Sequence, residues 1–317
     1  MESALQTVKT TAADTTLAIT EELSGRFVKY IDAMPQTVAT YKTGVRKLLA
    51  WLADKGIGRP TREDIAEYRD GLKASCKPAS VSLYMSAARL FFRWTAEQGI
   101  YPNVAEHMKG AKLDRGHKRE CLTSAAVRDV LSTAKGDSLA ELRDYAVLAV
   151  MATCGLRCIS ITRANVEDLR TVAAGGELMP ALYYQGKGRE DKSAFVKLAP
   201  QVADAINAYL AARGKTGGEA PLFASVSHNS TGERLTTRSV SRLVKEHFQA
   251  AGYDRATLTA HSLRHTAATL ALLNGEGLEQ VREMLDHANI NTTMVYAHAI
   301  ERAKSTCEYT VAKAVFC

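Results

Sequence analysis

The sequence predicts a mostly α-helical protein with one small β-hairpin, divided into two domains. Apolar residues recur at helical spacing along most of the 317 residues. A polar, charged stretch at 111–120 interrupts that pattern and predicts a linker. The one segment with strand character, Leu178 to Leu198, has a centre rich in glycine and charge and predicts a hairpin. We therefore expect a helical domain over 21–110 and a helical domain with a small sheet over 121–317.

The first domain is expected to contain roughly four helices. Pro35 is expected to close the first helical pattern. An apolar stripe marks the second helix: Val38, Tyr41, Val45, Leu48, Leu49 and Leu52. Thr61 followed by Asp64 predicts a capping signal for the third helix, and 80–98 predicts the fourth.

The second domain is expected to be helical on both sides of the hairpin. Thr123 and Ser124 predict the start of its first helix. Further helical patterns span 139–153, 202–212, 238–251, 262–273, 278–285 and 293–304. Residues 1–20 precede both domains, are rich in Thr and Ala without a period, and are expected to form a flexible extension.

Composition favours a cytoplasmic protein with a polyanionic partner. No apolar run approaches the ~18 residues of a membrane span, and the N-terminus lacks the basic-then-apolar pattern of a secretory signal. The six cysteines include no C-x-x-C pair, which favours reduced thiols over disulfides or a zinc ribbon. The net charge is +7, and residues 21–120 hold 18 Lys and Arg against 12 Asp and Glu. That excess favours a polyanion as partner.

The C-terminal third gathers residues suited to phosphodiester chemistry. His261, Arg264 and His265 stand at i, i+3 and i+4, so a helix places them on one face. His287 and then Tyr296 follow. A phenol that attacks a phosphodiester needs cations for the phosphoryl oxygens, imidazoles for proton transfer and a nearby nucleophile, and this set supplies them.

Each of these residues also has an ordinary structural explanation. The two helical histidines are equally explained as caps or core residues, and Tyr296 as half-buried packing. Their spacing also invites comparison with a zinc-protease helix, but Ser262 stands where the general-base Glu of H-E-x-x-H belongs. We therefore expect no metal site.

Two further cations stand in glycine-containing motifs. Arg157 ends a Gly-Leu-Arg that follows an apolar helix, where a buried guanidinium is costly unless an anion or acid meets it. Its partner is either a phosphate or a nearby acid such as Glu167 or Asp168. Lys187, in a Gly-Lys-Gly at the centre of the hairpin, can reach a phosphate with its backbone close by, although a solvated hairpin lysine has the same sequence.

These motifs, in the order G-L-R, G-K-G, H-x-x-R-H, L-x-H and tyrosine, resemble the tyrosine recombinase (phage integrase) family of DNA strand-exchange enzymes. The resemblance implies an N-terminal four-helix core-binding (SAM-like) domain and an α-rich catalytic domain that form a C-shaped clamp around duplex DNA. It also implies site-specific recombination, in which strands are cut and rejoined through a 3′-phosphotyrosyl intermediate without cofactor or metal.

The same resemblance assigns the catalytic roles. Arg157, Arg264 and His287 hold the nonbridging oxygens of the scissile phosphate, Tyr296 attacks phosphorus, His261 assists proton removal and Lys187 protonates the departing 5′ oxygen. Lys192 is a lesser candidate for the role of Lys187. One position departs from the family: G-L-R-x-S-E-L carries an acid three residues after the arginine, where this chain has Ser160. No acidic supporting residue is therefore carried over.

The nucleophile region matches the family pattern T-T-x-x-Y-x-H at Thr292, Thr293, Tyr296 and His298. Tyr309 is a competing phenol that matches no family position. Beyond Tyr296 the tail carries an apolar stripe: Ile300, Ala303, Cys307, Val311 and Val315. The stripe either packs on its own domain or, as the resemblance implies, docks onto a neighbouring protomer in a tetramer on DNA.

Two other functions remain open from the sequence. A type IB topoisomerase-like relaxing enzyme shares this chemistry but works as a monomer, and a DNA-binding regulator could carry a silent site. We expect no separate arm-binding domain before residue 20, an expectation that disfavours the larger three-domain integrases. The pattern predicts neither the target DNA sequence nor the choice between an integrase of a mobile element and a resolvase.

Overall fold

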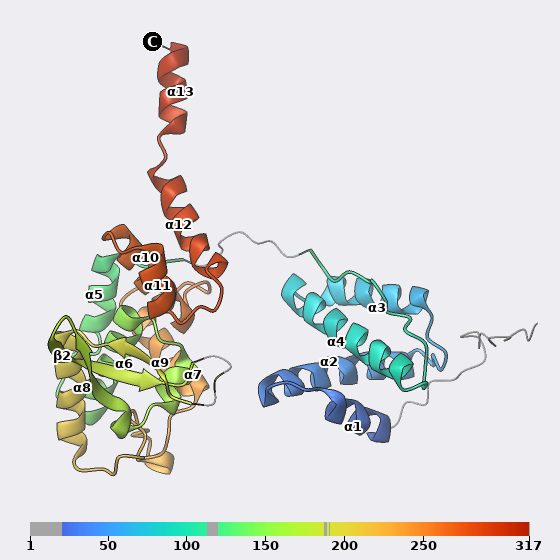
Figure 1. Ribbon diagram of the computed structural model, residues 1–317, viewed down its shortest axis with the longest axis horizontal. Helices are drawn as coiled ribbons and strands as arrows, with labels where there is room; N and C mark the ends of the chain where they lie inside the picture. The colour runs from blue at the N-terminus through green and yellow to red at the C-terminus, as the bar shows by residue number, and fades with distance from the viewer. Residues whose placement is uncertain (1–20, 113–119, 187–188, 190, 317) are drawn as a thin grey trace, which may run out of the picture. The chain divides into compact units, whose positions relative to one another are not determined.

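The structure of the protein is a computed structural model that describes residues 21–112, 120–186, 189 and 191–316 (Figure 1). The chain divides into two compact units, Met1–Gly116 and His117–Cys317, and each has its own hydrophobic core. The described part is mostly helical with one three-stranded sheet, so the predicted fold class is confirmed. The expected extension at 1–20 and most of the expected linker at 111–120 lie outside the described residues.

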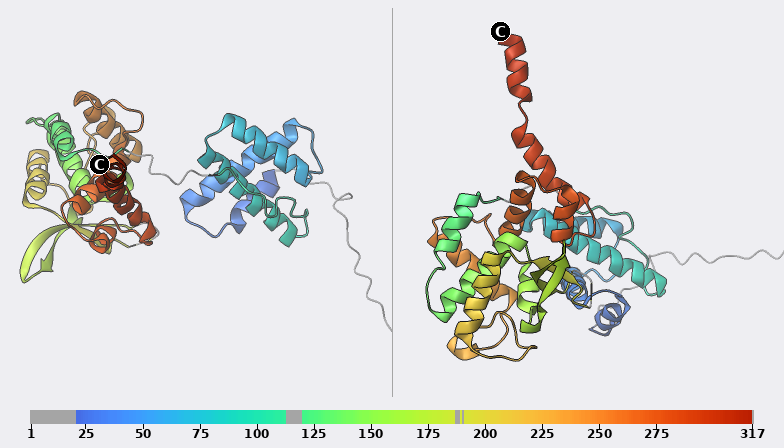
Figure 2. Two further views of the ribbon diagram at one scale, coloured as in Figure 1. Left: turned by 90° about the horizontal axis from the view of Figure 1, so that it is seen from above. Right: turned by 60° about the vertical axis from the view of Figure 1, so that its left-hand side comes forward.

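Four helices form the described part of the first unit (Figure 2). They are α1 (Glu21–Tyr30), α2 (Pro35–Asp54), α3 (Arg62–Ser75) and α4 (Pro78–Glu97). The Thr61 hydroxyl and the Asp64 carboxylate form a capping box at the start of α3, as expected. The expectation that Pro35 closes a helix is wrong. Pro35 opens α2 instead, because a proline at the first helical position sacrifices no intrahelical hydrogen bond.

The core of the first unit lies between its four helices. Gly44 allows α2 to approach α4 closely, because a Cβ at this position would lie 2.6 Å from the Ala87 Cβ. Phe27, Phe91 and Trp94 form an aromatic cluster with ring centroids 5.4, 5.5 and 5.9 Å apart. These contacts hold α1 and α2 against α4.

The second unit packs helices around a small sheet. Before the sheet lie α5 (Ser124–Ser132), α6 (Leu139–Cys154) and α7 (Cys158–Arg163). After it come α8 (Pro200–Arg213), α9 (Thr237–Ala250), α10 (Ala260–Leu273), α11 (Leu278–Met284), α12 (Asn291–Lys304) and α13 (Cys307–Phe316). Short 3-10 turns lie at Val166–Asp168 and His228–Ser230. None of the described helices is both long enough and apolar enough to cross a membrane.

The sheet has one strand more than the sequence predicted. The arms of the predicted hairpin are β2 (Glu177–Tyr184) and β3 (Ala194–Lys197), and β1 (Leu169–Ala174) pairs with the other edge of β2. All pairs are antiparallel, with Leu182 opposite Leu169 on one side and Val196 on the other. In the sequence the Gly-Lys-Gly motif falls between β2 and β3, and of its three residues only Gly186 is among the described residues.

The last two helices differ in their packing. α12 packs on α10 and α11, whereas α13 buries no residue and extends away from the body of the unit (Figures 1 and 2). On α13, Val311 is 61% exposed and Val315 is 66% exposed. The expected apolar stripe is therefore divided between two helices, and its α13 part is open to solvent.

Candidate active site

Helix α10 buries the arginine of H-x-x-R-H between the ends of two other helices. Arg264 is 1% exposed, and its guanidinium donates to the Gly155 carbonyl at 2.8 Å and to the Leu285 carbonyl. Gly155 follows α6 with a φ of 64°, and Leu285 follows α11. Because these acceptors are backbone atoms of ordered helix ends, the plane of the guanidinium is fixed before any ligand binds.

The environment of Arg264 leaves it charged and ready for an anion. Burial, and after it the charge of Arg157, lower the pKa of Arg264 to about 10, while Tyr296, Tyr184 and Asp286 oppose the shift. A pKa of about 10 still leaves the guanidinium protonated at neutral pH. Within the described chain, neither Arg264 nor Arg157 forms an ion pair with a carboxylate. An incoming phosphate can therefore act as their counter-ion.

Arg157 caps the start of α7 and is half-buried. Its charge lowers the pKa values of both Arg264 and His287, so its guanidinium lies close to both. The two acids considered from the sequence have other partners: Asp168 accepts from Lys192 at 2.5 Å and from the backbone N–H of Asn165 at 2.7 Å, and Glu167 accepts from the Asn165 side-chain amide at 3.5 Å. Arg157 is thus left for the site.

His287 lies on the turn between α11 and α12 and is 7% exposed. Its Nδ1 lies 2.9 Å from the hydroxyl of the fully buried Thr293. Burial, followed by the charges of Arg264, Arg157 and Arg282, lowers the pKa of His287 to about 4, so the ring is neutral at neutral pH. A neutral ring that accepts the Thr293 proton at Nδ1 carries its own proton on Nε2, and can donate it to a phosphoryl oxygen.

Tyr296 is more deeply buried than a half-exposed packing residue. It is 4% exposed and belongs to a small apolar cluster with Ala268, Val281 and Leu285. Its ring centroid lies 5.2 Å from that of His265, which in turn lies 4.6 Å from that of His261 with the two imidazoles perpendicular. The predicted nucleophile and the predicted base therefore both contact His265, a residue to which the sequence assigned no role.

The two lysine candidates have different outcomes. Lys187 lies outside the described residues, so its predicted role stays a prediction. Lys192, the lesser candidate, is engaged in the ion pair with the buried Asp168, which is 1% exposed. That pair fastens the loop before β3 to the turn before β1, which is a structural role.

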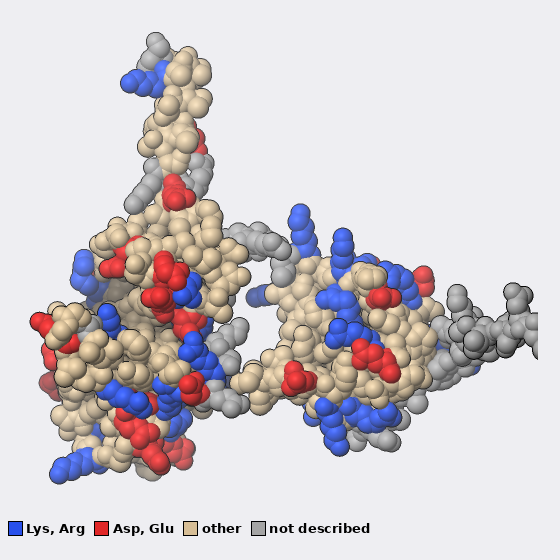
Figure 3. Space-filling model, in the orientation of Figure 1, with Lys and Arg blue, Asp and Glu red and all other residues tan. Residues whose placement is uncertain are grey.

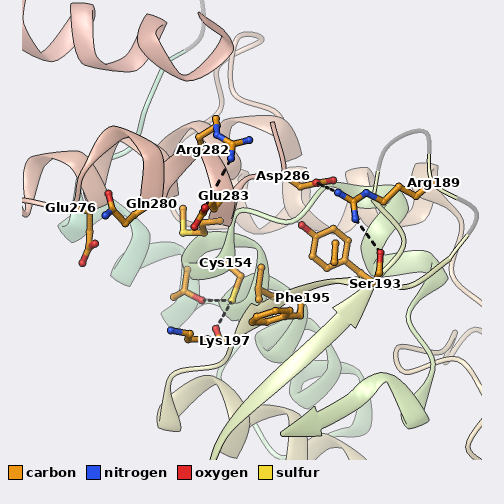
Figure 4. A pocket seen from close by; sticks show the side chains of 15 residues that line it. Cys154, Arg189, Ser193, Phe195, Lys197, Glu276, Gln280, Arg282, Glu283 and Asp286 are labelled. Carbon is orange, nitrogen blue, oxygen red and sulfur yellow. Dashed lines mark hydrogen bonds and ion pairs between the residues drawn. The ribbon is translucent and has the colours of Figure 1, made fainter. Parts of the chain in front are cut away.

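A cavity of about 690 Å³ opens between the β2–β3 hairpin and α11 (Figure 4). Tyr184 of β2, Arg189 of the hairpin and Asp286 of the α11–α12 turn line one side of it. Burial, followed by the charge of Asp286, raises the pKa of Tyr184 to about 12, so this phenol stays protonated. Among the described residues, no three His, Cys, Asp or Glu side chains are placed to hold a metal ion together.

A buried phenol in contact with an imidazole, on a helix packed against the one that buries Arg264, is the arrangement expected of a tyrosine-type DNA strand transferase. Comparison with known sequences agrees. Residues 120–302 match the profile described as the Phage integrase family, and residues 26–99 match the one described as Phage integrase, N-terminal SAM-like domain. The chain belongs to the phage integrase family of tyrosine recombinases, which confirms the resemblance seen in its motifs.

Curated relatives and solved structures extend this likeness over most of the chain. Tyrosine recombinase XerC of Pelobacter propionicus is 30% identical over 271 residues, which cover 83% of this chain and 85% of that protein. Tyrosine recombinase XerD of Lacticaseibacillus casei is 28% identical over 280 residues, which cover 86% of this chain and 92% of that protein. XerH site-specific recombinase, in a post-cleavage complex with a palindromic difH substrate, shares the fold with a TM-score of 0.71 at 20% identity, covering 90% of this chain and 84% of that one.

Proposed function

We propose that the chain is a site-specific DNA recombinase that cuts and rejoins DNA strands through a phosphotyrosyl link at Tyr296. The observation that carries this proposal is the packing of Tyr296 against His265 on the helix that also holds the buried, charged Arg264. Nucleophile and electrostatic stabilisation therefore come from neighbouring helices, α12 and α10, of one unit.

The proposed reaction follows from these residues. The Tyr296 oxygen forms a bond to phosphorus while the bond from phosphorus to the 5′ oxygen breaks. The phenolic proton passes to His261, and Lys187 supplies a proton to the departing 5′ oxygen. Arg157 and Arg264 bind the nonbridging oxygens as charged forks, and His287 binds one as a neutral N–H donor. The ester bond conserves the energy of the phosphodiester, so rejoining needs no nucleotide and no metal.

We assign duplex DNA binding to residues 21–110 together with the catalytic unit at 121–317. Basic side chains are spread over the visible face of the first unit (Figure 3). A hollow of about 370 Å³ beside the start of α3 is lined by Arg62, Arg69, His107 and Lys109 with one acid, Glu63. Such a lining suits phosphate contacts, which dominate the affinity of proteins for DNA.

Assembly on DNA is assigned to the tail. The α13 face that carries Val311 and Val315 is uncovered in the single chain. We infer that it docks onto a neighbouring copy and that four copies work together. In support, a lambda integrase of the same fold, with a TM-score of 0.62 at 18% identity, is a tetramer on a Holliday junction. Cys76, Cys154, Cys158 and Cys307 form no disulfide within the described part of the chain, which fits a reaction in the reducing cytoplasm.

A nicked suicide substrate tests the chemistry, because loss of a short strand traps the covalent adduct. Wild-type protein should accumulate the adduct, while Tyr296→Phe should bind the same DNA with unchanged affinity and form none. An adduct that persists in Tyr296→Phe would disprove the assignment. Holliday junctions formed between two sites would separate recombination from simple relaxation by a topoisomerase-like monomer.

A further inference from the structure

Asp286 adopts a backbone conformation that its side chain disfavours. Its φ is 48°, in the left-handed region that favours glycine. It lies between Leu285, whose carbonyl accepts from Arg264, and His287, whose ring contacts Thr293. Strain of this kind gathers at functional sites, where the surrounding structure holds it in place.

The Asp286 carboxylate faces Gly186 and Arg189, which lie between β2 and β3 and are called the hairpin neck below. Oδ1 lies 3.8 Å from the Arg189 guanidinium, and Oδ2 would lie 2.5 Å from a Cβ built on Gly186. Figure 4 shows Asp286 and Arg189 directed toward each other at the edge of the cavity. The carboxylate and the hairpin are therefore in close contact, and a residue larger than glycine at 186 would force them apart.

Arg189 connects this contact to a wider network. Its guanidinium also donates to the Ser193 hydroxyl at 3.0 Å, and its carbonyl accepts from Gln185 Nε2 at 2.7 Å. Gln185 Oε1 in turn accepts from Arg163 at 2.7 Å. Arg163 ends α7, the helix that Arg157 caps. Contacts thus run without a gap from α7 through the hairpin neck to the α11–α12 turn.

We propose that Asp286 is a positioning residue that holds the β2–β3 hairpin against the turn bearing His287, so that Lys187 of the hairpin and His287 of the turn act on one phosphate. This proposal rests on the roles proposed above for His287 and Lys187. The charge of Asp286 also reaches the residues around the site. Burial and then Asp286 raise the pKa of Tyr184, and Asp286 opposes the lowering of the Arg264 pKa that burial and Arg157 cause. Asp286 thereby supplies an acid to a site that has Ser160 where the family pattern has a carboxylate.

Two substitutions separate the charge of Asp286 from its backbone strain. Asp286→Asn keeps a residue that tolerates the left-handed region and removes the charge, whereas Asp286→Gly removes both charge and strain. Glu276→Gln neutralises an exposed acid that lines the same cavity and is the matched control. Arg189→Gln removes the other partner of the ion pair.

Single-turnover cleavage should be measured on a suicide substrate with either oxygen or sulfur at the 5′ bridging position. Sulfur leaves without being protonated, so the pair of substrates reports on proton delivery from the hairpin. We expect both Asp286 variants to bind DNA normally and cut the oxygen substrate about tenfold more slowly. On the sulfur substrate their rates should return to within about twofold of wild type. Glu276→Gln should match wild type on both substrates.

Three results would overturn the proposal: wild-type rates in both Asp286 variants, the same deficit on the oxygen and sulfur substrates, or fully additive losses when Arg189→Gln is combined with Asp286→Asn. Asp286→Gly should also be at least as stable to urea as wild type, which separates a slow site from a misfolded one. If wild-type protein forms no adduct on either substrate, the proposed function itself fails, and no variant is needed to see it.

Discussion

Helices α10 and α13 reverse the usual relation between polarity and burial. α10 holds the guanidinium of Arg264 at 1% exposure, whereas α13 leaves Val315 66% and Phe316 85% exposed. The difference lies in the partners that each helix finds. Arg264 has two backbone carbonyls at the ends of α6 and α11, and no described residue covers the valine face of α13. In these two helices, burial follows the available partner rather than the hydropathy of the side chain.

The two helices are therefore suited to different ligands, α10 to an anion and α13 to a protein surface. A charged group that is desolvated and fixed in place is preorganised for an anion, because little reorganisation is needed when the phosphate arrives. An apolar face that is left open is prepared for another protein surface. The proposed function uses both, with chemistry at α10 and assembly at α13.

Substitution of Arg264 should produce the largest effect. Arg264→Lys offers one nitrogen in place of a planar fork and cannot satisfy both carbonyls and a phosphate. Cleavage on the suicide substrate should fall by on the order of 10²-fold or more, with only a modest change in DNA affinity. Arg255→Lys, at a side chain 67% exposed, is the control. Equal losses in affinity and in cleavage rate would mean that Arg264 only positions the DNA.

His287 should give the protein a dependence of stability on pH. Its folded pKa of about 4 lies below the ordinary value of 6.5. Between these values the unfolded chain binds more protons, so stability is complete above pH 6.5 and is lost as pH falls toward 4. His287→Gln should reduce the difference in unfolding free energy between pH 7 and pH 4.5 by on the order of 1–3 kcal/mol. If urea titrations gave the same difference in unfolding free energy for His287→Gln and wild type, the His287 ring would be protonated as easily in the folded protein as in the unfolded chain.

The smallest effect on the monomer is expected at α13. The paired substitutions Val311→Asp and Val315→Asp should change the free energy of unfolding by less than about 0.5 kcal/mol, as exposed positions do, yet abolish cooperative binding to two half-sites. Val281→Asp, at a residue 1% exposed, should by contrast unfold the second unit. A clear loss of monomer stability in the α13 variant would mean that the helix packs on its own domain.

Local signals in the sequence predicted most of the fold. The structure contains the capping pair of Thr61 with Asp64 and the helix start at Thr123. Such signals could be predicted because they depend on residues close together in the sequence. β1 was missed, because Leu-Arg-Thr-Val-Ala-Ala alternates only weakly in polarity and pairs along one edge of β2 alone. The glycines at 175 and 176, both with positive φ, were the available sign of its turn.

Contacts between distant residues explain what the sequence did not predict in the site. The carbonyls that hold Arg264 come from residues 109 and 21 positions away, and hydrogen bonds to the backbone leave no mark in residue type. His265 was visible in H-x-x-R-H, but its contact with Tyr296 needs the packing of α12 on α10. Asp286 was only the variable residue of L-x-H, since its left-handed φ follows from the turn and not from its identity.

The most direct test of the account is to identify the amino acid that carries the DNA. After trapping on a suicide substrate, protease digestion and mass spectrometry should place the adduct on Tyr296 alone, linked to a 3′-phosphate, with a free 5′ hydroxyl on the released strand. An adduct on Tyr309, which is 78% exposed on α13, or on any residue other than Tyr296, would contradict the claim that the nucleophile belongs to the buried cluster around Arg264.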